Sequence, residues 1–232
     1  MMRNRFTSLV PGLALLLLMA AAPAMADSMA FSSLVPCTGI PATAACQPGN
    51  QNWGGNLGLA FTVNPPGGID VTQVGVFDAA GDGLVGSITV GIYNFLTGIL
   101  VPGTKYTFGP GTSQPLVNGY RMYSLPQSVM LAGGVEYQVV AVGFSSSDPN
   151  GNQRLYSGYI PPVVASGISY QGGYYDGNTS LDKPSIGPYL EGSPGSVFEA
   201  GTFAFTPEPT SIVLLFTVAG CVALILRRRL SA

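Results

Sequence analysis

Residues 86–94 read GSITVGIYN, and this stretch sets the expectation for the fold. Ile88, Val90 and Ile92 take every second position in it. Successive side chains of a β-strand point to opposite faces of the sheet, so the three aliphatic side chains would share one face. Residues 135–141 repeat the alternation. The pattern predicts two strands that each bury one face in a core.

Similar short apolar runs recur through residues 56–205, separated by Gly- and Pro-rich turns such as 65–68 and 78–83. This spacing, without a long run of helical periodicity, is typical of an all-β sandwich or barrel. Residues 145–196 are rich in Ser, Asn, Gly, Pro and Tyr, and we expect long loops or an irregular face there. We predict an antiparallel, jelly-roll-like β-sandwich with strands at residues 56–63, 71–77, 86–94, 105–108, 120–125, 129–131, 135–144, 167–175 and 197–205.

The order of elements from Asn56 to Phe144 resembles a β-sandwich domain of unknown function that occurs in secreted bacterial proteins and has some likeness to carbohydrate-binding modules. The resemblance rests on residues 58–63, 74–76, 86–93 and 131–139. These are strand and turn signatures. The resemblance therefore implies a fold and leaves the ligand open.

The N-terminal end has the three parts of a secretory signal peptide. Arg3 and Arg5 give a positive n-region, residues 9–22 form a short apolar h-region, and residues 24–26 read AMA, an A-x-A cleavage site. We expect cleavage directly before Asp27 and export of the rest.

The C-terminal end carries a Pro-Glu-Pro tripeptide, an apolar run at 211–226 and three arginines, in that order. Sixteen helical residues would rise about 24 Å, so flanking residues must lengthen the span to cross a hydrocarbon core of about 30 Å. The arginines would stay cytoplasmic, which places the body outside. This order resembles the PEP-CTERM sorting signal of Gram-negative bacteria, which marks a protein for an exosortase. The resemblance implies a sorting role for Pro207, Glu208, Pro209, Arg227, Arg228 and Arg229.

Together these signals divide the chain into four parts. We expect a signal peptide at 1–26, an N-terminal segment at 27–55, a β-sandwich body at 56–206, and a sorting signal with a transmembrane helix at 207–232.

The exported body is sparsely and mildly negatively charged. Its four basic residues, Lys105, Arg121, Arg154 and Lys183, stand against ten acidic ones, which gives a net charge near −6. Four scattered cations do not form the basic patch that nucleic acid requires. The composition favours a polar, neutral ligand or other copies of the chain.

Cysteine usage fits an oxidising compartment. Cys37 and Cys46 are the only pair in the body, and we expect them to form a disulfide, with two free thiols as the alternative. The chain contains no histidine, and two cysteines without histidine make a zinc site a poor interpretation.

The absence of histidine also excludes the Ser-His-Asp and Cys-His triads. A pair of carboxylates, as glycoside hydrolases use, is the remaining catalytic arrangement. The acidic residues of the body mostly lie beside turn residues or on the exposed side of a strand, so we expect no enzyme and no catalytic residue. Glycoside hydrolysis is kept as the less favoured alternative.

Two loops have carboxylates at spacings that a cation could use. Asp148, Asn150 and Asn152 have the 1-3-5 oxygen spacing of a calcium loop, but other residues stand where an EF-hand needs Gly and Glu. A turn with side-chain hydrogen bonds is the favoured interpretation for these residues and for Asp78 and Asp82. We expect no cofactor and no metal ligands, with a structural calcium as the alternative.

Tyrosines are concentrated in the later part of the body, among amides and carboxylates. A sugar ring stacks on an aromatic ring while its hydroxyls bind such polar groups, so this region is the candidate for glycan binding. Loop tyrosines equally suit an adhesive or self-associating surface. The only tryptophan, Trp53, we interpret as a plug of the core. The candidate glycan-binding residues are Tyr156, Tyr159, Tyr170, Tyr174 and Tyr175.

The sequence thus predicts an exported bacterial envelope protein that is held at the inner membrane by its C-terminal helix. An exosortase-like membrane protease would then release it to the cell surface or extracellular matrix. The body would be a non-catalytic module that binds exopolysaccharide or neighbouring copies. The alternative is a surface protein that stays anchored in the membrane.

Overall fold

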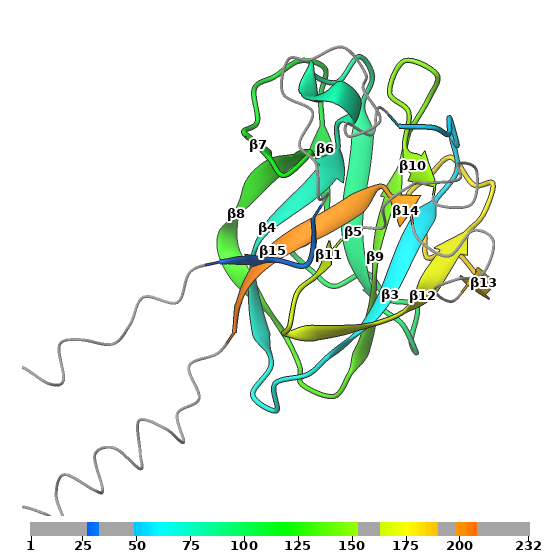
Figure 1. Ribbon diagram of the computed structural model, residues 1–232. Helices are drawn as coiled ribbons and strands as arrows, with labels where there is room; N and C mark the ends of the chain where they lie inside the picture. The colour runs from blue at the N-terminus through cyan, green and yellow to red at the C-terminus, as the bar shows by residue number, and fades with distance from the viewer. Residues whose placement is uncertain (1–26, 33–48, 153–162, 190–197, 208–232) are drawn as a thin grey trace, which may run out of the picture.

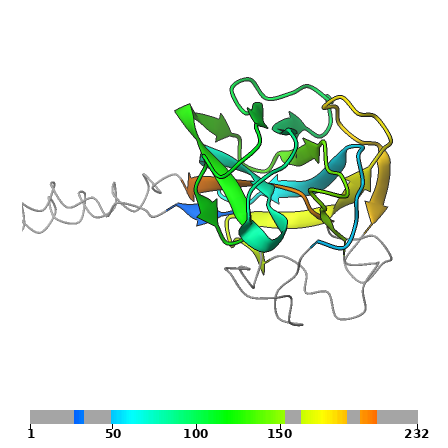
Figure 2. The ribbon, with the colours of Figure 1, turned by 90° about the horizontal axis from the view of Figure 1, so that it is seen from above.

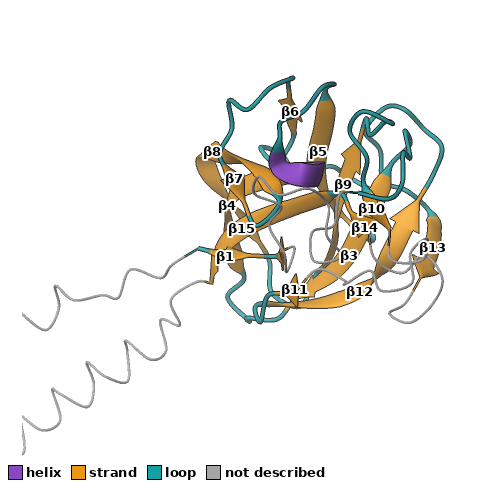
Figure 3. Ribbon diagram, turned by 45° about the horizontal axis from the view of Figure 1, so that its top comes forward, coloured by secondary structure: helices purple, strands orange, loops and turns teal. Residues whose placement is uncertain are grey.

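The computed structural model describes residues 27–32, 49–152, 163–189 and 198–207 (Figure 1). Within these residues the chain is all-β, as the sequence predicts, and every strand pair is antiparallel. The one helical element of the described part is a 3-10 turn, η1 (Ala79–Gly81) (Figure 3).

Two larger sheets face each other across the core (Figures 1 and 2). The five-stranded sheet has the order β1 (Ser28–Met29), β15 (Gly201–Pro207), β4 (Ile69–Phe77), β8 (Tyr120–Leu131) and β7 (Leu116–Val117). The six-stranded sheet has the order β13 (Ile186–Tyr189), β12 (Ile168–Tyr175), β3 (Leu57–Val63), β9 (Glu136–Val142), β5 (Ile88–Asn94) and β6 (Tyr106–Phe108). Two short ladders join β10 (Gly151–Asn152) to β14 (Phe198–Glu199), and β11 (Val163–Val164) to β2 (Phe31–Ser32).

The core lies between the two sheets. The apolar residues that alternate along the strands point into it. Ile88, Val90 and Ile92 are completely buried, which confirms the face predicted for β5. Phe61 of β3 lies 4.9 Å from Phe203 of β15, measured between ring centroids. Aromatic contact across the core therefore holds the two sheets together.

At a second place the sheets meet through stacked rings. Tyr106 of β6 and Tyr123 of β8 are nearly parallel, with centroids 3.5 Å apart. Both residues are partly buried and pack against the core. The stack joins the edge strand of one sheet to an inner strand of the other.

Strand β8 differs from the prediction, which ended one strand at Leu125 and began another at Val129. The structure has a single strand that includes Pro126. The pairing of β8 with β4 shifts register between Val71 and Gln73, opposite this stretch. A bulge therefore accommodates the proline, whose nitrogen has no hydrogen to give to the ladder.

The six-stranded sheet also differs from the predicted alternation, because its second face is buried as well. Tyr93, Gln138, Val140 and Val142 point away from the other sheet, yet all four are buried. A strand that is covered on both faces reads as a continuous apolar run, as Val139-Val-Ala-Val142 does. Further chain must therefore cover this outer face.

The two ends of the described chain lie side by side (Figures 1 and 2). Ser28 and Met29 pair with Phe205 and Ala204 of β15. The Asp27 carboxylate accepts a hydrogen bond of 2.7 Å from the Thr72 hydroxyl. The residue expected to begin the exported chain is thus already attached to the five-stranded sheet.

A buried ion pair fixes the turn that contains η1. The Arg121 Nε lies 2.6 Å from the Asp78 carboxylate, and both side chains are at least nine-tenths buried. The same guanidinium donates to the carbonyls of Gln114 and Gly81. Burial raises the pKa of Asp78 above its ordinary value, while Arg121 acts in the opposite direction.

We predict that Arg121→Met destabilises the protein by about 3–5 kcal/mol at pH 7, because it leaves the buried Asp78 carboxylate without a positive partner and with only the Gly83 N–H as a donor. Without Arg121 the pKa of Asp78 rises further. A raised native pKa gives stability that is present at acid pH and lost as pH rises through that pKa. Urea unfolding should therefore show a smaller deficit at pH 4 than at pH 7.

The double variant Asp78→Asn, Arg121→Met is the control for this prediction, since it removes both charges. It should lose less stability at pH 7 than Arg121→Met alone. Equal losses at both pH values in the single variant would contradict the role given to the Asp78 charge.

Candidate functional site on the outer face of the six-stranded sheet

The outer face of the six-stranded sheet is the surface of β12, β3, β9 and β5 that points away from the other sheet. Its central positions are small, because Gly58, Ala60, Gly91 and Gly172 lie there. Larger residues surround them. We call six of these the outer-face cluster: Tyr93, Phe95, Glu136, Gln138, Tyr174 and Lys183.

Residues 176–184, which lie in the connection from β12 to β13, form a covering segment over part of this face. The Tyr93 hydroxyl donates a hydrogen bond of 3.0 Å to the Leu181 carbonyl. A Cβ atom added to Gly91 would lie 2.8 Å from Leu100 Cδ1 and 3.0 Å from Leu181 Cδ2. The two leucine side chains therefore rest directly on the backbone of β5.

One side chain, the completely buried amide of Asn56, holds the start of the covering segment. Its Nδ2 donates to the Asp176 carboxylate at 3.0 Å and to the Ser180 carbonyl at 3.0 Å, with the Asn178 carbonyl at 3.2 Å. Its Oδ1 accepts from the Asp182 N–H at 3.1 Å. The segment wraps around Asn56, which stands immediately before β3.

Aromatic rings and a cation lie beside the covering segment. Phe95 and Tyr174 meet edge to face, with centroids 5.3 Å apart. Lys183 Nζ lies 4.4 Å from the centroid of the Phe95 ring, within the range of a cation–π interaction. The phenol of Tyr174 is buried, whereas Phe95 and Lys183 are partly exposed.

Negative charge exceeds positive charge around the cluster, where Glu136 and Asp182 stand against Lys183. Burial raises the pKa of Glu136 above its ordinary value, and the positive charge of Lys183 opposes this. Burial and the Glu136 charge raise the pKa of Tyr174. Burial and the Asp182 charge do the same for Tyr93. Both phenols therefore stay neutral at pH 7 and act as hydrogen-bonding groups.

Gln138 is the most unusual member of the cluster. Its side chain is completely buried, and neither its Oε1 nor its Nε2 has a hydrogen-bond partner among the described residues. A Cβ atom on Gly58 would lie 2.7 Å from the Gln138 Nε2, so the amide lies across the backbone of β3. A buried amide group without a partner costs about 1–3 kcal/mol.

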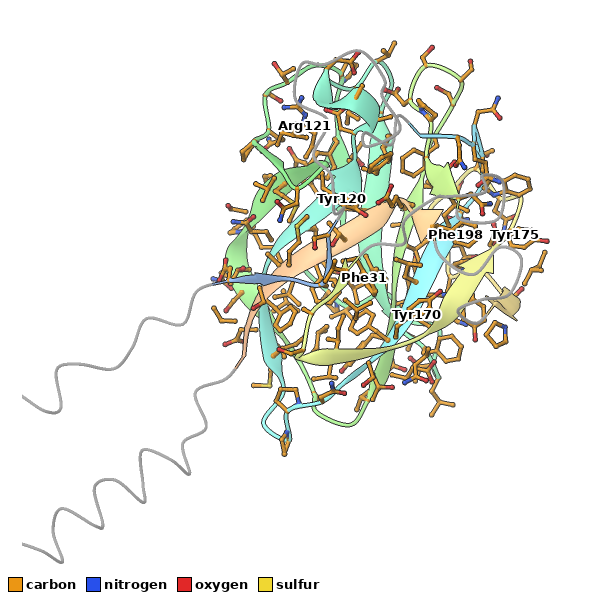
Figure 4. All side chains as sticks on the ribbon, viewed as in Figure 1. Phe31, Tyr120, Arg121, Tyr170, Tyr175 and Phe198 are labelled. Atoms are coloured by element: carbon orange, nitrogen blue, oxygen red, sulfur yellow. The ribbon has the colours of Figure 1, made fainter. Side chains whose placement is uncertain are left out.

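The tyrosines proposed for glycan binding do not share one face of the sheet. Tyr170 and Tyr175 point inward, where they are partly buried against Phe31 and Phe198 respectively (Figure 4). Tyr174 lies on the outer face. Tyr156 and Tyr159 lie outside the described residues.

Trp53 packs at the edge of the core. Its ring meets Tyr175 edge to face at 5.5 Å, and its Nε1 donates to the Asp176 carbonyl at 2.9 Å. The side chain is partly buried and contacts the core. This position agrees with the interpretation of Trp53 as a plug, and it supports the start of the covering segment.

The loops considered for calcium use their oxygens in structural hydrogen bonds. The Asp148 carboxylate accepts from the Val85 and Gly86 N–H groups at 2.8 and 2.6 Å. The amides of Asn150 and Asn152 both donate to the side chain of Gln51. These side chains connect separate segments, and Asp78 is held by Arg121 as described above. In the described part of the chain, no three Cys, Asp or Glu residues gather as metal ligands would.

Most of the residues expected to act in sorting lie outside the described chain. Pro207 is the last residue of β15 and pairs with Ile69, while Glu208, Pro209 and the three arginines are not described. The same holds for Cys37 and Cys46. Residues 27–207, as far as the structure describes them, include no helix long and apolar enough to cross a membrane. The span expected at 211–226 is beyond this range.

Comparison of the chain with models of known protein families, and with curated protein sequences, gives no match.

Sequence analysis did not identify two residues that are important in this site, Asn56 and Gln138. Asn56 is the first residue of the strand predicted at 56–63, and nothing local to it indicates partners that are 120 or more positions away. Gln138 carried a signal, because it interrupts a stretch in which Tyr137, Val139 and Val140 predict burial on both faces.

We predict that Asn56→Ala destabilises the protein by about 2–4 kcal/mol, because the completely buried Asn56 amide makes several hydrogen bonds to residues 176–182 and all of them are lost at once. Amide hydrogen exchange of residues 176–182 should also accelerate more than that of the strands. Urea unfolding and exchange measured by mass spectrometry would test this.

Asn64→Ala is the matched control, since Asn64 is exposed and its side chain bonds only to Ser166 and Ser169 among the described residues. Its effect should stay within about 1 kcal/mol. If both variants behave alike, Asn56 does not anchor the covering segment.

Proposed function

We propose that the chain is an exported bacterial envelope protein that an exosortase-like membrane protease sorts through residues 207–232. The signal peptide directs export, the C-terminal helix holds the precursor in the inner membrane, and removal of the tail releases the body to the cell surface or extracellular matrix. The chain is a substrate of this machinery.

The position of Pro207 carries this proposal. Pro207 ends β15, so the Pro-Glu-Pro tripeptide begins where the described fold ends. Two prolines fix their own φ angles and discourage both strand and helix, which keeps the tripeptide extended. A protease in the membrane could reach such a peptide directly beside the anchor.

The arrangement of the chain ends supports the same proposal. β1 and β15 pair, so the new N-terminus and the tail leave from one end of the body (Figure 1). This end would face the membrane while the tail is attached. The rest of the body would face the extracellular matrix.

For the body we propose a jelly-roll-like sandwich that acts as a non-catalytic module and associates with exopolysaccharide. The support is the outer-face cluster, which combines aromatic rings with amide and hydroxyl groups. Three of the described carboxylates already make structural bonds: Asp78 with Arg121, Asp148 with backbone N–H groups, and Asp176 with Asn56. This use of the carboxylates disfavours a hydrolase.

We predict that Glu208→Ala leaves export and anchoring intact and blocks removal of the tail, because the apolar run and the arginines suffice to stop transfer. The variant should accumulate in the membrane fraction at precursor size. Immunoblots of membrane and culture fractions would measure this. Glu191→Ala is a control of the same chemistry outside the tripeptide, and it should be processed like the parent.

If Glu208→Ala is processed and released normally, the exosortase proposal fails. If the parent itself keeps its tail and stays in the membrane, the permanently anchored alternative takes its place.

We predict further that the exported protein begins at Asp27. Cleavage there leaves the Asp27 side chain free to bond Thr72 and leaves Ser28–Met29 as an edge strand. N-terminal sequencing of the exported protein would test this prediction. A protein that is intact from Met1 would contradict the signal peptide.

A further inference from the structure

We propose that the outer face of the six-stranded sheet binds a neutral sugar chain, with the Gln138 amide as its specific hydrogen-bonding group and the covering segment as a cover that must open. This inference rests on the proposed association of the body with exopolysaccharide. It adds where the sugar binds, which side chain forms hydrogen bonds with it, and that the sugar is uncharged.

The Gln138 side chain has unused hydrogen-bonding capacity. Its amide offers two donors and one acceptor, and none of them is used by the described residues. On the neighbouring strands it stands beside Ala60 of β3, which has no polar side-chain atom, and Tyr93 of β5, whose hydroxyl donates to the Leu181 carbonyl. Sugar hydroxyls both donate and accept, so one sugar unit could satisfy the whole amide.

The sheet surface beside this amide is made of small residues. Gly58, Ala60 and Gly172 lie on the same face as Gln138, and none of them projects more than a methyl group. The amide lies flat over Gly58, as its contact with an added Cβ shows. A flat ligand could lie along β3 and still meet the amide.

Aromatic side chains lie on both sides of the Gln138 amide. Tyr93 and Tyr174 flank the amide from β5 and β12, and Tyr174 is backed by Phe95. Aromatic rings beside amide and hydroxyl groups suit the apolar faces and hydroxyls of a sugar. Glu136 and Asp182 carry two negative charges against the one positive charge of Lys183, so this face disfavours a uronic acid or a phosphate. The sugar is therefore a neutral one.

The covering segment is attached to the sheet by few contacts near the amide. The covering segment has no strand of its own, and residues 177–180 are exposed. Near the amide it is attached to the sheet through the Tyr93 hydroxyl and the leucine contacts on Gly91. Opening between Leu181 and Pro184 would break the Tyr93 bond and the bond between the Asp182 N–H and Asn56, and would expose Gln138. The bonds of Asn56 to Asp176 and Ser180 would keep the start of the segment in place.

The test is binding of cellohexaose, laminarihexaose and maltohexaose, three neutral glucan probes, by the full-length protein in detergent, with hexagalacturonic acid as the acidic comparison. We expect at least one neutral probe to bind and the acidic one not to bind. Gln138→Met keeps the length of the side chain and removes its polar atoms. It should weaken binding of that probe at least tenfold while the melting temperature stays equal or rises.

Gln73→Met makes the same change on β4 of the other sheet and should leave binding unaltered. Tyr93→Phe removes the bond to the Leu181 carbonyl and should speed association, because the cover opens more readily. In nuclear magnetic resonance spectra of the parent, the side-chain amide signals that Gln138→Met removes should shift on addition of the neutral probe.

The outcomes separate this inference from the proposed function. If the parent binds a neutral probe and Gln138→Met binds it equally well, the site is wrong and glycan association stands. If the acidic probe binds as tightly as the neutral ones, the charge class is wrong. If the parent binds no probe, the site and the proposed glycan association both fail, whereas the sorting proposal is still judged by Glu208→Ala.

Discussion

The contact between Phe61 and Phe203 in the centre of the core is the constraint on which the rest of the structure depends. It joins strands that are about 140 positions apart in the chain, and it brings together the inner strands of two different sheets. Residues on the inner faces of β5 and β9 are buried because this contact sets the sheets face to face. Large aromatic side chains are well suited to this role, since each removes 150–250 Å² of surface from water.

Formation of the six-stranded sheet creates a second apolar face, on the side away from the core. Once β12, β3, β9 and β5 form one sheet, their outer face would expose Val140, Val142 and Tyr93 to water. The covering segment, anchored by Asn56, reduces the exposure of Tyr93 and of the neighbouring backbone at Gly91. The six-stranded sheet is therefore enclosed on one side by a large aromatic core and on the other by a thin layer held through a few polar contacts. Displacing the covering segment from the outer face would therefore lose less stability than opening the core between the two sheets.

Sequence reasoning succeeded where local periodicity decides the structure. Ile88, Val90 and Ile92 alternate over enough positions to fix both the strand and its buried face. It failed at Pro126, because a bulge in β8, opposite Thr72 of β4, allowed a proline inside a continuous strand. The two-residue strands carry no pattern of their own and exist only through their partners. Asn56 and Gln138 were missed because their roles come from packing between distant segments.

The position of Pro207 at the end of a paired strand has one more consequence. Only Glu208, Pro209 and Thr210 separate it from the apolar run that begins at Ser211. Three extended residues span at most about 11 Å. An anchored body would have almost no standoff from the lipid headgroups, and the strand ends around Ile69 and Met130 would press toward them. If the tail is removed as proposed, a protease approaching this gap would meet the folded body itself, and the last residues of β15 would have to unpair from β4 to give it access.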